Sequence, residues 1–249
     1  PDFSGSTQTP LNQFILNPVY SSENDVFSYV APPLLFNPVT EYSSRIAFSD
    51  VKINNAITDG WRQVPPPNYR DLDGNYGEIN KLILYNDQMY YLQDNAFGIL
   101  SINPVSTITD DMGSNITLGV GKKVIQDHKN ISIYTGCKEN RHVIAGQTGI
   151  YWLDISTKKA YHFNPKGLNP ISDTKLMKSF KRFQDLGPKS VICLGYDYVN
   201  NEILYSIGSE QSAGDTLVYS EITKSFTSTY SFYTNIFMSL PDKLLSVPY

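Results

Sequence analysis

Short apolar segments separated by tight turns recur along most of this chain, and this rhythm limits its fold more than any other feature. The clearest example predicts three strands, at Ile79–Tyr85, Met89–Gln93 and Ala96–Ile102, with Asn- and Asp-containing turns between them. Antiparallel strands need only such short connections, whereas parallel strands need a long crossover. The segment therefore predicts an antiparallel meander.

The same rhythm returns twice and then starts again. The two best-matched segments are Tyr151–Ile155 and Leu217–Ile222, each followed by Ser or Thr, by Lys and by an aromatic-containing strand. A further unit begins at Ile236 and breaks off. The strands predicted for the second and third units are 130–135, 142–145, 150–155, 160–163, 190–196, 202–207, 216–222 and 226–230.

A small sheet with two apolar faces cannot bury itself alone, so repeated units of this kind must stack on their neighbours. Radial stacking of four-stranded antiparallel blades is the propeller solution. We therefore predict an all-β, propeller-like fold, with Trp152 buried between blades. Because the meander repeats about three times and then stops, the propeller is expected to be incomplete.

Matching segments are about 52 and about 66 residues apart, longer than the roughly 40–50 residues of a blade. The excess is assigned to loop insertions on one face, with one short helix over Thr174–Phe183. Residues 1–42, rich in Pro, Ser and Asn, are expected to form an extended segment leading into blades over residues 43–249. The whole is expected to be part of a longer polypeptide. The predicted insertions are 103–128, 164–189 and 208–215.

Composition narrows the functional classes. Charged residues make up 18% of the chain and the formal net charge is −4, so no basic surface is available to hold DNA by counterion release. If DNA meets this protein, we expect the protein to line the passage through which the DNA moves and not to bind it. No apolar stretch is long enough to predict a membrane span, and no signal peptide is apparent.

The residue types that carry chemistry are scattered. Cys137 and Cys193 are interpreted as buried small side chains, and His128, His142 and His162 lack the spacing of a metal or nucleophile site. The five arginines, Arg45, Arg62, Arg70, Arg141 and Arg182, are not gathered in the sequence.

Two acidic segments were tested as sites. Asp71–Asn75 has the alternating oxygen ligands of a calcium loop, but Tyr76 stands where such a loop needs Gly, and Leu82 where it needs Glu. Asp110-Asp111 lies in a loop where turn formation accounts for both residues. We therefore assign no catalytic residue, no cofactor-binding residue, no metal ligand and no cofactor, and expect the protein not to be an enzyme.

Several segments resemble the propeller of tail proteins from short-tailed phages, in particular crAss-like phage tail proteins of the muzzle, tail-hub or nozzle kind. The resemblance covers roughly residues 43–249. The segments that carry it include Arg45–Lys52, Asp59–Gln63, Gly149–Asp154, Gly167–Ser172 and Asn200–Tyr205.

This resemblance implies a structural part of a virion tail, forming part of the channel for genome ejection. It implies a homo-oligomeric ring, six-fold or twelve-fold, beside other tail and portal-proximal proteins, with DNA in transient passage. Assembly is expected in the cytoplasm of the host bacterium, and the final location is the virion. The alternatives are a propeller that binds a host surface glycan or protein, and a propeller hydrolase or lyase.

Overall fold

The computed structural model describes residues 41–50, 60–102, 106–109, 115–118, 124–173, 190–209 and 212–248. The chain divides into two compact units, one formed by residues 1–74 and 100–128 and the other by residues 75–99 and 129–249. The helix predicted over Thr174–Phe183, the Asp110-Asp111 pair and nearly all of the extended segment predicted over residues 1–42 lie outside the described residues.

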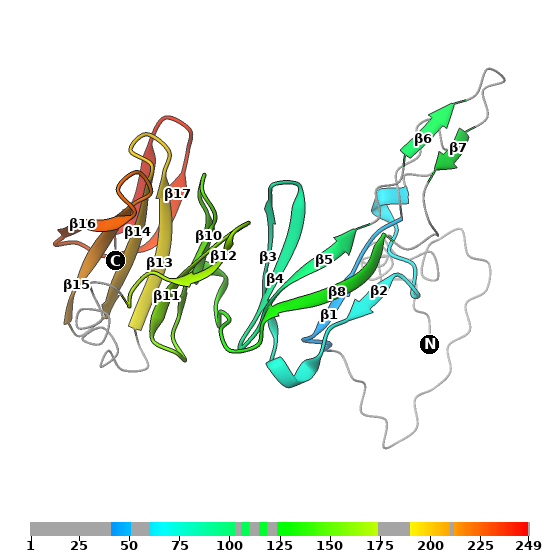
Figure 1. Cartoon of the computed structure of the whole chain (residues 1–249), viewed down its shortest axis with the longest axis horizontal. Helices are drawn as coiled ribbons and strands as arrows, with labels where there is room; N and C mark the ends of the chain where they lie inside the picture. The colour runs from blue at the N-terminus through cyan, green and yellow to red at the C-terminus, as the bar shows by residue number, and fades with distance from the viewer. Residues whose placement is uncertain are drawn as a thin grey trace, which may run out of the picture. The chain divides into compact units, whose positions relative to one another are not determined.

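Antiparallel β-structure dominates the described part of the chain (Figure 1). Sheet 1 has the order β3 (Ile79–Tyr85), β4 (Gln88–Gln93), β5 (Phe97–Ile102), β8 (Ile125–Ser132). Sheet 2 is the meander β9 (Val143–Ala145), β10 (Ile150–Asp154), β11 (Lys159–Asn164), β12 (Gly167–Pro170). Sheet 3 is the meander β13 (Ser190–Asp197), β14 (Glu202–Ser209), β15 (Ser212–Ser220), β16 (Ser225–Tyr230). Sheet 4 pairs β17 (Thr234–Ser239) with β18 (Leu244–Pro248).

The all-β, propeller-like prediction is confirmed, and so are most of its strands. The first strands of sheets 1 to 4 begin at residues 79, 143, 190 and 234. The last two intervals, 47 and 44 residues, are those of ordinary blades. The first interval is longer because the hairpin of β6 (Ser106–Thr109) and β7 (Asn115–Leu118) stands between β5 and β8.

Two strand assignments made from the sequence were wrong. The first half of the segment predicted as strand 130–135 of the second unit belongs to β8, the fourth strand of sheet 1, and the second half is not a strand. The fourth strand of sheet 2 is β12, inside the predicted insertion 164–189. This strand begins with Gly167 at φ +138° and ends at Pro170. An edge strand tolerates both residues, and it therefore lacks the apolar pattern that reveals a central strand.

The predicted insertion 208–215 is also wrong, because β14 and β15 extend into it from both sides. The strongest internal sequence match has a different meaning as well. It equates β10, the second strand of sheet 2, with β15, the third strand of sheet 3. What the two segments share is the turn that follows, where Lys158 and Lys224 both adopt positive φ, at 61° and 52°.

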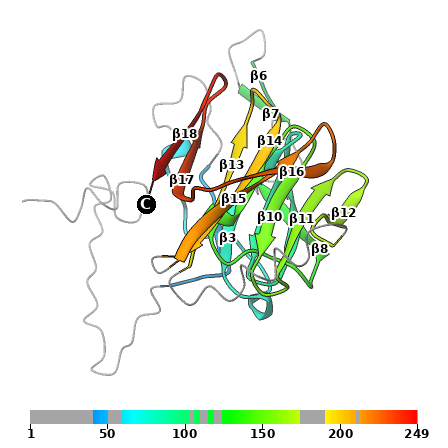
Figure 2. The ribbon, with the colours of Figure 1, turned by 90° about the vertical axis from the view of Figure 1, so that its left-hand side faces the viewer.

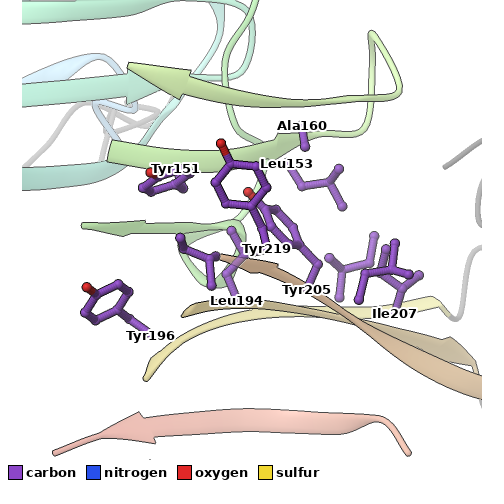
Figure 3. Packing of buried hydrophobic residues seen from close by; sticks show 11 residues of the cluster. Tyr151, Leu153, Ala160, Leu194, Tyr196, Tyr205, Ile207 and Tyr219 are labelled. Atoms are coloured by element: carbon purple, nitrogen blue, oxygen red, sulfur yellow. The ribbon is translucent and has the colours of Figure 1, made fainter. Parts of the chain in front are cut away.

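Sheets 1, 2 and 3 are joined by two apolar clusters. One packs Tyr90, Leu92 and Phe97 of sheet 1 against Val143, Ile150, Trp152 and Phe163 of sheet 2. The other fills the space between sheets 2 and 3 (Figure 3). Trp152 is completely buried in the first cluster, with its ring 4.8 Å from that of Phe97, which confirms its predicted position between blades.

The first unit contains smaller elements. Strand β1 (Arg45–Ala47) pairs with β2 (Tyr69–Asp71), and a 3-10 helix occupies Gly60–Arg62. The Arg45 guanidinium lies 4.1 Å from the ring centre of Tyr42 and 3.8 Å from that of Tyr69. These cation–π contacts hold β1 against β2.

The two tryptophans provide a matched test of the stacked core. We expect Trp152→Ala to lower the free energy of unfolding by about 3–5 kcal/mol, because it leaves a cavity between sheets 1 and 2. Trp61→Ala should cost less than about 1 kcal/mol, since Trp61 is 55% exposed. Urea denaturation followed by circular dichroism measures both, and equal losses would contradict the assignment of Trp152 to the core.

Candidate functional site

Several buried polar side chains, among them Glu221, Ser206 and Thr234, lie at the interfaces between sheets and form the candidate site. Side chains alternate between the two faces of a strand. On β14, Ile203, Tyr205 and Ile207 face sheet 2, whereas Ser206 bonds with Thr234 of sheet 4. A single strand thereby serves two interfaces.

Tyrosine is the main aromatic side chain between sheets 2 and 3. Figure 3 shows Tyr151 of β10 on one side and Tyr196, Tyr205 and Tyr219 of sheet 3 on the other. Tyr151 also stacks on His162, with ring centres 4.3 Å apart. These rings provide a large apolar contact, and the hydroxyl groups of Tyr151 and Tyr196 form hydrogen bonds at its margin.

A buried carboxylate joins the two sheets at that margin. Glu221 follows β15, is 5% exposed, and reaches Thr148 in the turn between β9 and β10. Its Oε1 accepts hydrogen bonds from Thr148 N at 3.1 Å and Thr148 Oγ1 at 2.9 Å. Its Oε2 accepts one from the Tyr196 hydroxyl at 2.8 Å. We call Glu221, Thr148 and Tyr196 the carboxylate clasp.

The surroundings of the clasp favour its hydrogen-bonded form. Burial raises the pKa of Tyr196 and of Tyr151 above their ordinary values, so both hydroxyls keep their protons. Gly146 lies so close that a Cβ there would be 2.4 Å from Glu221 Oε1. The carboxylate can enter this position only because residue 146 has no side chain.

A second buried carboxylate acts within sheet 2. Asp154 Oδ1 accepts hydrogen bonds from Ser156 N at 2.8 Å and Thr157 N at 3.2 Å, which fixes the turn after β10. Its Oδ2 accepts one from Gly136 N at 3.3 Å. The corresponding turn of sheet 3 uses Ser220 Oγ, which accepts from Thr223 N at 3.5 Å.

Sheets 3 and 4 meet closely through glycines. A Cβ on Gly195 would lie 2.5 Å from the Phe237 ring, and one on Gly208 would lie 2.3 Å from the Tyr233 ring. The absent side chains leave room for these rings, because a real Cβ never comes so near another atom.

The histidines considered in the sequence occupy separate surroundings. The Arg70 Nε–H donates to His128 Nδ1 at 3.3 Å, and Arg70 also pairs with Asp127 at 2.5 Å. His142 is buried near Glu139, with 3.8 Å between His142 Nε2 and a carboxylate oxygen. In the described residues, no group of three or more His, Cys, Asp or Glu side chains is placed to hold a metal ion.

The other sequence candidates also have structural partners. Asp71, in the segment tested as a calcium loop, receives both of its hydrogen bonds from Arg45, at 2.6 and 2.9 Å. Arg141 pairs with Glu139 at 2.8 Å. Cys137 and Cys193 are buried free thiols, as interpreted from the sequence, and burial raises the pKa of Cys137 to about 12.

Sequence reasoning did not find the carboxylate clasp. Glu221 lies inside the strand predicted at 216–222, and Thr148 lies between the strands predicted at 142–145 and 150–155. These two residues are 73 positions apart, and no spacing rule connects them. Their link becomes visible only when the stacking order of sheets 2 and 3 is known.

Together these features define a class: an all-β, propeller-like stack whose described buried polar groups bond turns and sheets to one another. No helix in the described ranges is long and apolar enough to cross a membrane.

The sequence profile of the Crassvirus muzzle protein matches residues 2–248, and the chain belongs to that family. It is 25% identical over 231 residues to the muzzle protein of Bacteroides phage crAss001. That match covers 90% of this chain but only 16% of the length of the crAss001 protein. The resemblance to crAss-like phage tail proteins is thereby confirmed, and the muzzle kind is selected from the three kinds considered.

The clasp gives a direct stability test. We expect Glu221→Ala to lower the free energy of unfolding by about 2–4 kcal/mol, because it leaves buried donors of Thr148 and Tyr196 without their acceptor. Glu202→Ala is the matched control and should cost less than about 0.5 kcal/mol, since Glu202 is partly exposed and lies opposite Asp197 in the sheet. Chemical denaturation of both variants measures the difference, and similar losses would refute the clasp.

His142 gives a test by pH. Burial lowers its pKa to about 4, whereas a histidine in an unfolded chain titrates near 6.5. Between these values the unfolded chain binds a proton that the folded chain does not, so stability is full above pH 6.5 and falls as pH drops toward 4. His142→Leu should flatten this dependence by roughly 1–3 kcal/mol between pH 7 and pH 4. Unfolding curves across that range measure the slope, and an unchanged slope would show that His142 does not contribute to it.

Proposed function

We propose that this protein is a structural component of a phage virion tail, in the muzzle, and forms part of the wall of the channel for genome ejection. Its membership of the Crassvirus muzzle protein family supports the location in the virion. The observation that carries the structural role is the carboxylate clasp. There a buried carboxylate of sheet 3 accepts two hydrogen bonds from Thr148 of sheet 2, at 2.9 and 3.1 Å, and one from Tyr196 of its own sheet, at 2.8 Å.

Mechanical demands on a channel wall agree with this architecture. A wall must keep its shape while DNA moves past under pressure, and close-packed sheets resist deformation because their side chains have no room to rearrange. The low charge content and net charge of −4 also suit the role. DNA is not held by a surface that releases few counterions.

Assembly would proceed in the host cytoplasm as a ring of six or twelve copies, beside other tail and portal-proximal proteins. Exposed aromatic side chains offer contacts for such neighbours, since Tyr and Phe are enriched in protein interfaces. The described chain carries several of them outside its sheet interfaces: Tyr134, Tyr198, Tyr230 and Phe232. The role requires no catalytic residue and no cofactor.

Purified particles provide the test. Gold-labelled antibodies against this chain should bind at the tail end of intact virions, and electron microscopy should show six or twelve copies around the tail axis. Antibodies against the major capsid protein are the control for orientation. Absence of the chain from purified particles would reject the proposal, and binding of the purified protein to host cells without particles would favour a receptor-binding module instead.

A further inference from the structure

Sheet 4 differs from sheets 1, 2 and 3 in its number of strands. Sheets 1, 2 and 3 each have four strands, whereas sheet 4 consists of β17 and β18 alone. In the described part of the chain, β18 has a hydrogen-bonded neighbour on one side only, which is β17. An open strand edge is a template for pairing with a further strand.

One face of sheet 4 is used in packing on sheet 3. The Phe237 ring lies against Gly195, and Thr234 N donates to Ser206 Oγ at 2.8 Å. In addition, Tyr196 N donates to Ser239 Oγ at 3.1 Å. Figure 2 shows β17 and β18 next to β13, in agreement with these contacts.

The opposite face of sheet 4 is apolar and open. Ile236, Met238, Leu245 and Val247 are 50, 57, 45 and 58% exposed. The strand register sets Ile236 opposite Val247 and Met238 opposite Leu245, so the four side chains form one continuous patch. We call these four residues the outer patch. On β17 they alternate with Phe237 and Ser239, which face sheet 3, so this strand has contact residues on one face and apolar residues on the other.

The other sheets show what covers such a face. Sheet 2 packs one face on sheet 1 and the other on sheet 3, and sheet 3 packs its two faces on sheets 2 and 4. In each case the cover is the apolar face of the next sheet along the same chain. Consecutive elements of a chain are usually neighbours in space.

We propose that the outer patch is covered by a further β-sheet of the same polypeptide, and that β18 pairs with a strand that completes sheet 4. The crAss001 muzzle protein, of which this match covers 16%, offers ample chain for such a sheet. This inference rests on the packing of sheets 3 and 4 and does not depend on the channel role.

A second copy of the chain is a poorer occupant. Four side chains are far fewer than the 20–30 residues that each partner of a stable interface contributes, in rough terms. A sheet on the same chain avoids most of the cost in translational and rotational freedom that two separate molecules pay to associate. A patch of four side chains is therefore sufficient to hold a covering sheet when that sheet belongs to the same polypeptide.

Cysteine labelling tests the proposal on the polypeptide as the phage makes it, purified as a monomer and again after assembly. Met238→Cys introduces a thiol into the outer patch, and Ser228→Cys introduces one on the exposed face of β16 as the matched control. Native Cys137 and Cys193 are buried and define the background. We expect maleimide to label residue 238 at least about tenfold more slowly than residue 228 already in the monomer.

Each other outcome overturns the proposal. Labelling of residue 238 as fast as residue 228, in the monomer and in the assembly, would show that nothing covers the outer patch. Protection that appears only after assembly would assign the cover to a second copy or to another tail protein. Hydrogen exchange of the unmodified polypeptide gives an independent check, because a completed sheet 4 protects the outward amides of β18 in the monomer and an open edge does not.

Discussion

Adjacent residues of strand β10 enter different interfaces, and the rest of the structure depends on this division. Trp152 enters the cluster with sheet 1, whereas Tyr151 and Leu153 enter the cluster with sheet 3. All five residues of the strand are buried. Such a strand is stable only when both faces of its sheet are covered, so sheet 2 cannot exist without its neighbours. Stacking is therefore a condition for each sheet to fold and not a later association of finished parts.

Apolar contact alone would leave the relative position of two sheets weakly defined. The carboxylate clasp and the bond between Ser206 and Thr234 supply direction, because hydrogen bonds require particular distances and angles. Burying a carboxylate is costly, and three donors at 2.8 to 3.1 Å offset this cost for Glu221. In this chain the buried polar groups determine how the sheets are aligned, while the aromatic rings provide most of the contact.

The sequence was sufficient to predict the central strands and the class of fold. Strands such as β10 and β14 have apolar residues on both faces, and tight turns separate them from their neighbours, so their positions follow from local pattern. Two edge strands, β8 and β12, were assigned wrongly, whereas the edge strands β3, β9, β13 and β16 lie where they were predicted. Strand β12 has Leu168 as its one large apolar residue, begins with Gly167 and ends at Pro170, and local pattern gives such a segment the appearance of a loop.

The candidate site was less accessible to sequence reasoning, for a related physical reason. A turn is fixed by three or four consecutive residues, and the shared turn chemistry at Lys158 and Lys224 was detected although it was mistaken for equivalence of strands. The clasp joins Thr148 to Glu221 across two sheets, and its partners are set by stacking. The pattern of neighbouring residues in the sequence contains no information about a contact between residues 73 positions apart.

The glycines between sheets 3 and 4 have a consequence for how this family can change. Gly195 and Gly208 do not have positive φ and are not required by the backbone. They are required by the rings of Phe237 and Tyr233, which occupy the space of a side chain. Each ring thus fills the space that a side chain at its glycine would need. A related protein that carries a larger residue at either glycine must carry a smaller one in place of the ring, so the two positions are expected to vary together and never singly.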